Sequence, residues 1–327
     1  MEQSAVRDGV TAEEVKGILL GMASGQETLL GYFRRFIRNF EKRVGINRTV
    51  GSLRAYSNAY SHIERFLQAQ YKLSDIPFSA LDRSFIDKYD LYLRTERNLA
   101  PGTIINLTVQ LKTIVGEAIA DGIITASPFM GYEPMRPKHV QKYLTAEELH
   151  RIMTTPLHRQ TLYHVRDMFL FSCFTGIPYG DMRLLTKDNL CLAEDGIWWI
   201  KSARQKTKIE FEIPLLDLPL QILKKYSGTA PGDKLLPMYC NSTLNLYLKE
   251  IARICHIDRP LVFHAGRHTY ATEITLSHGV PLETVSRMLG HSQIETTQIY
   301  AKVTDEKIDA DTKALNRKIS ERFSVVI

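Results

Sequence analysis

The stretch from His264 to Tyr300 constrains this chain most, because it places several chemically active side chains on short predicted helices. Its sequence is HAGRHTYATEITLSHGVPLETVSRMLGHSQIETTQIY. Apolar residues at helical spacing predict a first helix that ends at Gly279 and a second that begins at Val280-Pro281 and ends before Gly290. A third short helix is expected to open near Ser292, with its buried side formed by Ile294 and Ile299.

Four polar side chains in this stretch suit attack on a phosphodiester. The guanidinium of Arg267 can hold two phosphate oxygens through parallel charged hydrogen bonds. His264 and His291 can donate to the remaining oxygens or move a proton. Tyr300 can attack phosphorus and hold it as a covalent ester. The alternatives are that Tyr300 is an ordinary helical tyrosine and that His264 and His268 form a metal-binding pair.

The order and spacing of these residues resemble the C-terminal signature of the tyrosine recombinases, the phage-integrase family. The matching motifs are H-x-x-R-H-T-x-A-T at 264–272, L-G-H-S at 289–292 and T-T-Q-x-Y at 296–300. The resemblance implies site-specific DNA cleavage through a 3′-phosphotyrosyl bond, with no metal and no nucleotide cofactor. It also assigns His264, Arg267, His291 and Tyr300 to the family's catalytic positions.

Length and composition fit two domains and a polyanionic partner. The chain has 327 residues, room for about two domains, and a net charge of +6. No run approaches the roughly 20 apolar residues of a membrane helix, and the first residues, MEQSAVRDGVTAEEVKG, lack the apolar core of a secretory signal. The four cysteines never form C-x-x-C, so we expect no structural zinc. A protein that stays inside the cell is therefore expected, and the resemblance implies a cytoplasmic bacterial protein associated with the nucleoid.

A basic segment lies near the N-terminus. Between Gly31 and Arg54 the chain has seven basic residues and one acidic residue, Glu41, interleaved with an apolar helical stripe that includes Phe33 and Phe40. We interpret the basic residues as contacts to DNA phosphates, with a solvated basic face as the alternative. They are Arg34, Arg35, Arg38, Lys42, Arg43, Arg48 and Arg54.

Further helices are expected in the first half of the chain, from about Asp82 to Arg97 and from Pro101 to Asp121, the latter buried through Ile105 among others. The resemblance implies that residues 47–128 form the family's helical core-binding domain. The expected fold class is mainly α with a small β-sheet: a helical, SAM-like core-binding domain and a mixed α/β catalytic domain. The expected divisions are 1–29, an extension or remnant of an arm-binding domain; 30–129, the helical DNA-binding domain; 130–141, a basic linker that offers Lys138 to DNA; and 142–327, the catalytic domain with its tail.

One departure from the family pattern concerns its first catalytic arginine. Where the family has Thr-Gly-x-Arg-x-x-Glu, this chain reads Thr175-Gly-Ile-Pro178-Tyr-Gly-Asp181, so proline replaces the arginine and an acid remains. Losing one oxyanion contact costs on the order of 2.7 to 4 kcal/mol. Arg183 lies roughly 140° around a helix axis from position 178 and is expected to point elsewhere.

Arg204 is the better replacement. Residues 197–201 and 209–213 predict a β-hairpin, and the resemblance, counted back from Pro214, assigns Lys206 as the catalytic lysine that protonates the 5′-oxygen leaving group. Arg204 lies two residues earlier, on the same strand face if the chain is extended there. We predict that Arg204 reaches the scissile phosphate. The alternative is that Arg204 and Lys208 only neutralise DNA backbone.

The substituted arginine, the KYLTAEEL segment at 142–149 and the Pro-Phe end of the first domain look most like integrases of Bacteroidetes mobile elements, such as conjugative or mobilizable transposons. The family implies double-stranded DNA as partner, a monomer when free, a homotetramer in the synaptic complex, a host DNA-bending protein and no membrane. The apolar tip at 324–327 is expected to dock on a neighbouring protomer, or else on its own chain.

Other functions remain open at this point. A type IB topoisomerase uses similar residues and would relax supercoiled DNA without sequence preference. A catalytically silent DNA-binding regulator would form no covalent adduct, and Pro178 is its best support. A metal-dependent nuclease would need clustered carboxylates, which the sequence does not contain.

Overall fold

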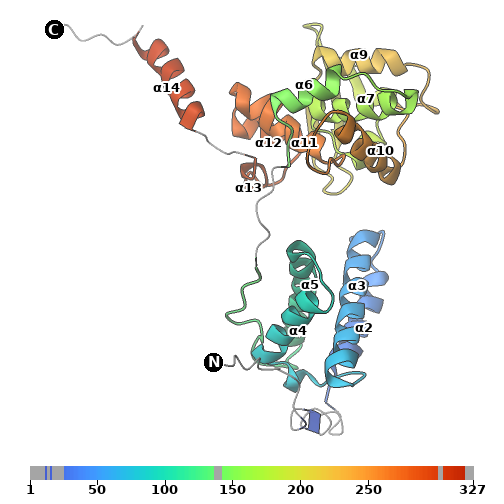
Figure 1. The fold of residues 1–327 in the computed structure, drawn as a ribbon, viewed down its shortest axis with the longest axis vertical. Helices are drawn as coiled ribbons and strands as arrows, with labels where there is room; N and C mark the ends of the chain where they lie inside the picture. Colours follow the sequence, from blue (N-terminus) through green and yellow to red (C-terminus); the bar gives the residue numbers. More distant parts are fainter. Residues whose placement is uncertain (1–11, 13–14, 17–25, 136–141, 301–304, 321–327) are drawn as a thin grey trace, which may run out of the picture. The chain divides into compact units, whose positions relative to one another are not determined.

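The computed structural model describes residues 12, 15–16, 26–135, 142–300 and 305–320. The chain divides into two compact units, residues 1–139 (unit 1) and 140–327 (unit 2), each with its own hydrophobic core (Figure 1). The fold is mainly helical with one three-stranded sheet in unit 2, as the sequence predicts. The boundary between the two units, at residues 139 and 140, lies inside the segment 130–141 that we interpret as a linker.

Unit 1 is built from helices α2 (Leu29–Glu41), α3 (Val50–Phe66), α4 (Arg83–Thr95) and α5 (Pro101–Ala120), with short turns at Leu67–Tyr71 and Phe78–Ala80. Local capping explains where the helices begin. Asp82 accepts a hydrogen bond from the backbone nitrogen of Phe85 at 2.7 Å and starts α4, and Pro101 occupies the first turn of α5. The start of α2 is capped from a distance, because Asp75 accepts from the backbone nitrogens of Leu30 and Gly31.

An aromatic cluster holds the core of unit 1 together. Phe66 of α3 is fully buried and contacts four other aromatic rings at centroid distances of 5.1 to 5.7 Å, namely Tyr71, Phe85, Tyr89 and Tyr92. Such pairs add about 0.5–1.5 kcal/mol each beyond burial of area. In α5 the fully buried position is Ile104, whereas Ile105, predicted to be buried, is only half-buried, because the packed face runs through 104, 107, 111 and 114.

The start of the segment that we interpret as a linker packs on unit 1. The carbonyl oxygen of Met130 accepts a hydrogen bond from Arg83 at 3.0 Å, and the Tyr132 hydroxyl donates to Asp90 at 2.7 Å. Residues 136–141, including Lys138, lie outside the described residues. The described part of this segment therefore extends the core of unit 1 at least to Tyr132.

Unit 2 opens with α6 (Ala146–Thr154), which begins at a capping box formed by Thr145 and Glu148. The central helix α7 (Gln160–Thr175) is buried over much of its length and is followed by the short α8 (Tyr179–Met182) and a turn at Lys187–Asn189. Helices α9 (Asp217–Tyr226) and α10 (Asn241–Ile254) pack against α7. Together these elements form the larger of the hydrophobic cores.

The sheet consists of β1 (Leu190–Leu192), β2 (Trp198–Ala203) and β3 (Glu210–Pro214), all antiparallel, in the order β1-β2-β3. The hairpin between β2 and β3 confirms the sequence prediction. Residues 204–209 form its turn, closed by hydrogen bonds from Arg204 nitrogen to Ile209 oxygen and from Lys208 nitrogen to Arg204 oxygen, both at 2.8 Å. The assumption that Arg204 and Lys206 share an extended strand face is therefore wrong, since β2 ends at Ala203.

In the C-terminal part of unit 2 the helices end at the two glycines that the sequence predicts as helix ends. Helix α11 (Ala265–Thr269) continues through turns at Tyr270–Thr275 and Leu276–His278 to Gly279, and α12 (Leu282–Leu289) ends at Gly290. Helix α13 (Glu295–Gln298) is correct in place, but its buried side is wrong: Ile299 is 64% exposed, whereas Thr297 and Tyr300 are buried. Thr297 of α13 and Tyr300, just beyond the end of the helix, are the residues that face inward.

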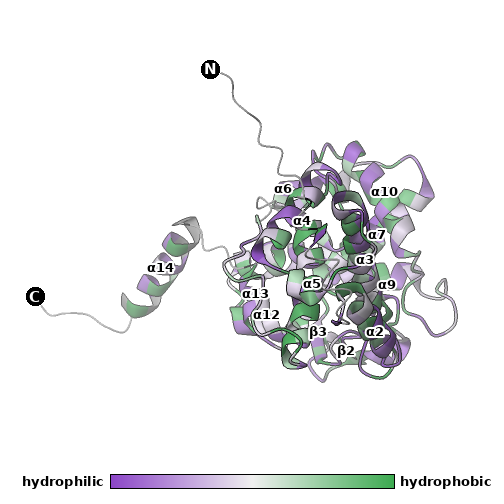
Figure 2. Cartoon of the chain, turned by 90° about the horizontal axis from the view of Figure 1, so that it is seen from below, coloured by the Kyte–Doolittle hydropathy of each residue, from purple (hydrophilic) through white to green (hydrophobic). Residues whose placement is uncertain are grey.

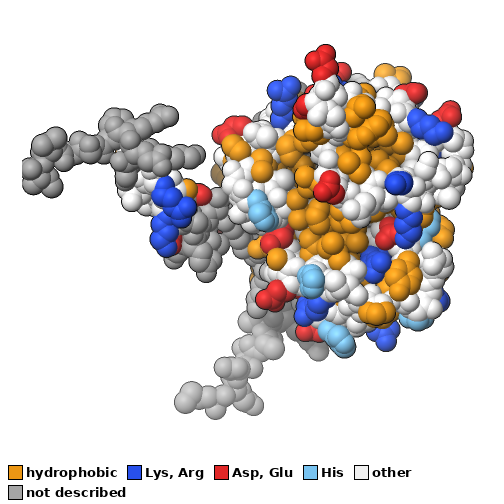
Figure 3. All heavy atoms as spheres, turned by 90° about the horizontal axis from the view of Figure 1, so that it is seen from above, with side chains coloured by type: hydrophobic (Ala, Val, Ile, Leu, Met, Phe, Trp, Pro, Cys, Tyr) orange, Lys and Arg blue, Asp and Glu red, His pale blue; other side chains and the backbone are white. Residues whose placement is uncertain are grey.

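Helix α14 (Asp305–Ser320) carries both hydrophobic and hydrophilic residues (Figure 2), and Ile308, Leu315 and Ile319 are exposed on it. The apolar tip at 324–327 lies outside the described residues. In the part of the chain that the structure describes, no helix is long and apolar enough to cross a membrane. On the face seen in Figure 3, hydrophobic side chains gather in a patch, and Lys and Arg lie mostly singly around it.

Candidate active site

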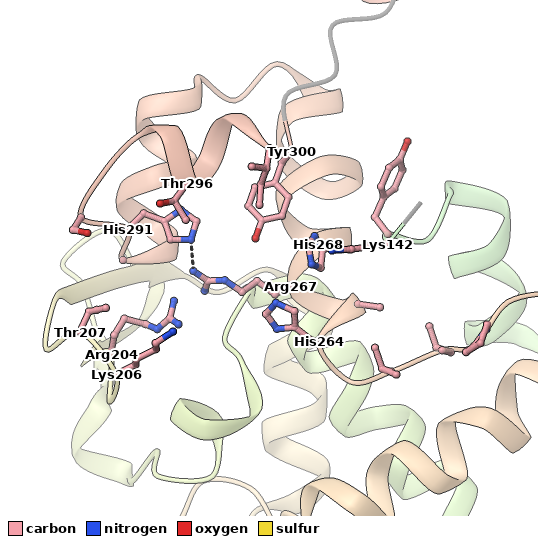
Figure 4. Close-up of a pocket in the computed structure, with 18 of the residues that line it drawn as sticks. Lys142, Arg204, Lys206, Thr207, His264, Arg267, His268, His291, Thr296 and Tyr300 are labelled. Atoms are coloured by element: carbon pink, nitrogen blue, oxygen red, sulfur yellow. Dashed lines mark hydrogen bonds between the residues drawn. The ribbon is translucent and has the colours of Figure 1, made fainter. Parts of the chain in front are cut away.

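A pocket of about 780 Å³ in unit 2 brings together the side chains that we predict to be catalytic (Figure 4). Its volume is in the range of small-molecule and substrate sites. The sequence-predicted residues that line it are Arg204, Lys206, His264, Arg267, His291 and Tyr300. The pocket is also lined by Lys142, Thr207, His268 and Thr296, whose positions in it are not predicted from the sequence.

Arg267, on α11, is at the centre of the pocket and is only 3% exposed. Its guanidinium donates to the carbonyl oxygens of Gly176 at 2.9 Å and Leu289 at 2.7 Å, and to Nε2 of His291 at 2.8 Å. Burial, with the nearby charge of Arg204, lowers the pKa of Arg267 to about 10, while the Tyr300 hydroxyl acts in the opposite direction. The guanidinium is therefore still charged at neutral pH and is fixed before any ligand binds.

The bonding of His291 fixes its tautomer. Because Arg267 has only donors, Nε2 of His291 must accept, so the proton is on Nδ1, which donates to the Thr297 hydroxyl at 2.7 Å. Burial and the charges of Arg267 and Arg204 lower the pKa of His291 to about 4. His291 is thus neutral at neutral pH. Thr297 is fully buried, and the sequence analysis included it only as a letter of the T-T-Q-x-Y motif.

Arg204 reaches the pocket from the hairpin turn, and an ion pair and a hydrogen bond hold its side chain. Its Nε lies 2.6 Å from Oδ2 of Asp181, and its Nη1 donates to the carbonyl oxygen of Leu289 at 3.0 Å. The other carboxylate oxygen of Asp181 accepts from the backbone nitrogen of Gln205 at 2.8 Å. The acid that follows Pro178 therefore anchors both the side chain of Arg204 and the backbone of the turn that carries Lys206.

Two glycines allow these contacts. Gly176 has φ +69°, and a Cβ there would lie 2.5 Å from the ring of Tyr270, next to the carbonyl that Arg267 binds. Gly290 has φ +64°, and a Cβ there would lie 2.9 Å from Cγ of Arg204. Both positions require the left-handed backbone and the absence of a side chain.

Tyr300 is 7% exposed, and its ring lies between two histidines. The ring of His268 meets it edge-on with centroids 5.0 Å apart, and the ring of His291 is nearly parallel to it at 6.3 Å. In Figure 4 the hydroxyl points toward Arg267 and the neighbouring histidines. The nucleophile that we predict is therefore held by packing, with its oxygen toward the guanidinium.

His264 and His268 meet edge to face with centroids 5.0 Å apart. Burial is the largest cause that lowers both pKa values, that of His268 to about 4, and the charges of Arg267 and Lys142 add to it. Among the described residues, no group of three or more His, Cys, Asp and Glu could hold a metal ion. A neutral His264 at the rim of the pocket is available to accept a proton.

Two cations near the missing arginine and the hairpin turn, Arg183 and Lys208, do not line the pocket. Pro178 precedes α8 in an extended conformation, and Arg183, the residue that we expect to point elsewhere, is exposed and does not line the pocket. Lys208 is exposed with φ +60° and does not line it either. Of the cations near this motif and the turn, Arg204 and Lys206 are the ones that face the pocket.

The basic residues predicted to contact DNA in unit 1 are all on its surface. Arg35 pairs with Glu27 at 2.9 Å, and Arg34 donates to the Tyr60 hydroxyl at 2.6 Å. The exposed set comprises Arg34, Arg35, Arg38, Lys42, Arg43, Arg48 and Arg54. None of them lines the pocket of unit 2, so any role in binding is separate from the chemistry.

Two family models match this chain. The model of the phage integrase family matches residues 142–307, and that of the phage integrase SAM-like domain matches residues 28–134. The chain belongs to the phage integrase family. As a member it is a tyrosine-type site-specific DNA recombinase.

Curated relatives agree with this family membership, and solved structures share the fold. Tyrosine recombinase XerD of Listeria monocytogenes is 25% identical over 273 residues, 78% of this chain and 89% of the relative. XerD of Staphylococcus saprophyticus is 26% identical over 297 residues, 86% of this chain and 96% of the relative. The Tn1549 transposon integrase in complex with transposon right end DNA superposes with a TM-score of 0.69 at 18% identity, covering 88% of this chain and 99% of that one. A lambda integrase tetramer bound to a Holliday junction gives 0.68 at 17%, covering 86% and 80%.

Proposed function

We propose that this recombinase cleaves and rejoins double-stranded DNA at specific sites to integrate or excise a mobile element. The observation that carries the proposal is the convergence of Tyr300, Arg267 and Arg204 in one pocket, with Lys206 on the same rim. A phenolic nucleophile beside two guanidinium groups matches attack on a phosphodiester, whose transition state gains negative charge.

The proposed reaction assigns a role to each group. Arg267 and Arg204 bind the non-bridging oxygens of the scissile phosphate, and the hydroxyl of Tyr300 attacks phosphorus while His264 accepts its proton. The bond from phosphorus to the 5′-oxygen breaks, and the ammonium of Lys206 protonates that oxygen. A 5′-hydroxyl of a partner strand then attacks the phosphotyrosine and gives its proton to the now neutral Lys206. The phosphodiester is restored, and Tyr300 leaves with the proton that His264 returns. His291 keeps Arg267 in place through its Nε2.

Arg204 is the proposed substitute for the arginine that Pro178 replaces. Its Nη2 makes no hydrogen bond within the described part of the chain, and its side chain is still 15% exposed, so donors remain for a phosphate. The ion pair with Asp181 holds the group in position without neutralising the pocket, because Arg267 and Lys206 are also cationic. A catalytically silent DNA binder is the second candidate, favoured by Pro178 alone.

Larger assembly and cellular role are part of the same proposal. Strand exchange between two duplexes requires four protomers, and the lambda integrase tetramer on a Holliday junction, which has a similar fold, supports this number. The exposed apolar residues of α14 suit docking on a neighbouring protomer. We further propose a mobile-element integrase of the Bacteroidetes type, acting with a host DNA-bending protein in the bacterial nucleoid; its support is the Pro178 substitution and the likeness to a transposon integrase.

A nicked suicide duplex from the ends of the encoding element tests the proposal. Cleavage next to the nick releases a short fragment and traps protein on DNA, so wild type is expected to give a denaturant-resistant adduct. Tyr300→Phe should give none, whereas the matched control Tyr270→Phe, which removes a buried hydroxyl outside the pocket, should retain it. Sequence-specific binding without an adduct would establish the silent regulator, and relaxation of supercoiled plasmid without sequence preference would indicate a topoisomerase.

A further inference from the structure

The charge of the pocket exceeds what one phosphodiester requires. Five cationic side chains line it: Lys142, Arg204, Lys206, Arg259 and Arg267. Arg204 is paired with Asp181 and Arg259 with Glu148, whereas within the described residues the other three have no carboxylate partner. A phosphodiester carries one negative charge, so the pocket is built for more of the DNA backbone than the scissile group.

The proposed reaction gives no role to Lys142 or to Arg259, and of these two only Arg259 has a carboxylate partner among the described residues. The backbone beside Lys142 is held by several hydrogen bonds. Two residues on, the backbone nitrogen of Leu144 donates to the hydroxyl of Thr269 at 3.0 Å. Thr269 is fully buried on α11, the helix that carries Arg267. The carbonyl oxygen of Tyr143 accepts from Arg259 at 2.6 Å, and Arg259 is bound in turn by both carboxylate oxygens of Glu148.

These contacts attach the backbone next to Lys142 to the helix of Arg267, so the base of the lysine side chain stays close to the site. Figure 4 shows Lys142 beside His268, with Arg204 and Lys206 on the opposite side of Arg267. Its charge is among the causes that lower the pKa values of His264 and His268, as expected for an ammonium group close to both rings. The lysine is exposed, so a ligand can reach it.

We propose that Lys142 binds a backbone phosphate next to the scissile phosphate on the cleaved strand, and so sets the path of that strand across Arg267. Cations on both sides of Arg267 suit a strand that crosses the pocket, with Lys206 at the leaving 5′-oxygen and Lys142 at the other flank. A lysine serves such a contact as a point charge on a flexible stem. The inference rests on the proposed function, because it takes the occupant of the pocket to be a DNA strand.

The salt dependence of binding tests the contact directly. Equilibrium binding of the full chain to an un-nicked site is measured over a range of salt concentrations for wild type, Lys142→Ala, Lys142→Arg and the control Lys224→Ala, an exposed lysine on α9 that does not line the pocket. Loss of one phosphate contact should lower the slope of log K against log salt by about 0.9. Lys142→Ala should show this decrease, whereas Lys142→Arg and Lys224→Ala should keep the wild-type slope.

A methylphosphonate scan then locates the phosphate. Each phosphate flanking the cleavage position is replaced in turn by an uncharged methylphosphonate, and adduct formation is measured at limiting and at saturating DNA. One replacement should reduce adduct formation by wild type but not by Lys142→Ala. The adduct defect of Lys142→Ala should become smaller at saturating DNA, because the scissile phosphate is still held by Arg267.

The outcomes separate this inference from the proposed function. The role of Lys142 is overturned if Lys142→Ala keeps the wild-type salt slope, or if wild type and Lys142→Ala respond identically to every methylphosphonate. A Tyr300-dependent adduct would still support the recombinase chemistry in that case. A defect that appears only in assembly of several protomers on DNA also overturns the role of Lys142, since the lysine would then contact a protein. Absence of any wild-type adduct would overturn the proposed chemistry, and the slope would still decide whether Lys142 contacts phosphate.

Discussion

Arg204 and Arg267 donate hydrogen bonds to the same acceptor, the backbone carbonyl oxygen of Leu289. One side chain comes from a β-hairpin turn and the other from α11, and their charges repel each other, which contributes to the lowered pKa of Arg267. A bound phosphate would relieve that repulsion by placing negative charge beside both guanidinium groups. The pair is therefore arranged for an anion.

Removal of Arg204 should abolish most covalent capture of DNA. Arg204→Ala deletes one donor to the charged transition state, which corresponds to a loss of about 10²- to 10³-fold in the cleavage rate. Single-turnover adduct formation on the suicide duplex measures it. Arg183→Ala, on an exposed residue outside the pocket, should cleave like wild type; the reverse pattern would show that Arg204 does not replace the missing arginine.

Asp181→Leu should destabilise unit 2 as well as impair cleavage. The ion pair with Arg204 is largely buried, and removing one partner of such a pair costs about 3–5 kcal/mol because a charge remains without compensation. Urea unfolding measures the free energy of unfolding. In the double variant Asp181→Leu with Arg204→Met the stability should largely return while cleavage stays low; additive losses of stability would contradict the ion pair.

Gly290→Ala should reduce cleavage through Arg204. The added methyl group would lie 2.9 Å from Cγ of Arg204, and the alanine would also have to adopt φ +64°. Gly279→Ala is the matched control, because it has a similar φ of +82° but open space around the added methyl. Both should lose about 1 kcal/mol of stability from backbone strain, and only Gly290→Ala should also lose adduct formation. Equal cleavage by the two variants would show that the Cγ contact has no consequence.

Acid should destabilise unit 2 through its neutral histidines. The folded protein lowers the pKa values of His268 and His291 to about 4, from an unfolded value of about 6.5, so the unfolded state binds protons first as pH falls. The stabilisation is complete above pH 6.5 and is lost between pH 6.5 and about 4, by up to about 1.4 kcal/mol per pH unit for each histidine. His291→Gln should flatten the pH dependence of the free energy of unfolding, measured by urea titration at each pH. An unchanged slope would mean that His291 titrates normally.

How much of this site could be predicted from the sequence depends on the range of the contacts involved. Gly279 and Gly290 mark helix ends because a left-handed residue ends a helix wherever it occurs, so local pattern suffices. The convergence of Arg267, His291 and Tyr300 followed from motif spacing. The anchoring of Lys142 through Leu144 and Thr269 joins positions 125 residues apart, which local pattern does not contain.

The predictions that are wrong also failed because of contacts that the local sequence pattern does not contain. Ile299 is apolar and yet exposed, because the inward positions here are taken by Thr297 of α13, which binds His291, and by Tyr300, which follows the helix. Arg204 lines the pocket, but the extended geometry invoked for it is wrong; the turn and Asp181, rather than strand alternation, direct it there. Helix burial and side-chain direction thus depended on polar contacts that composition does not reveal.

The short turn at 204–209 carries both Arg204 and Lys206, and its backbone is held to Asp181 through Gln205. In a relative with arginine at position 178, charge clamping and leaving-group protonation would be attached to separate segments. In this chain, displacement of the one turn at 204–209 would remove both of these proposed roles at the same time.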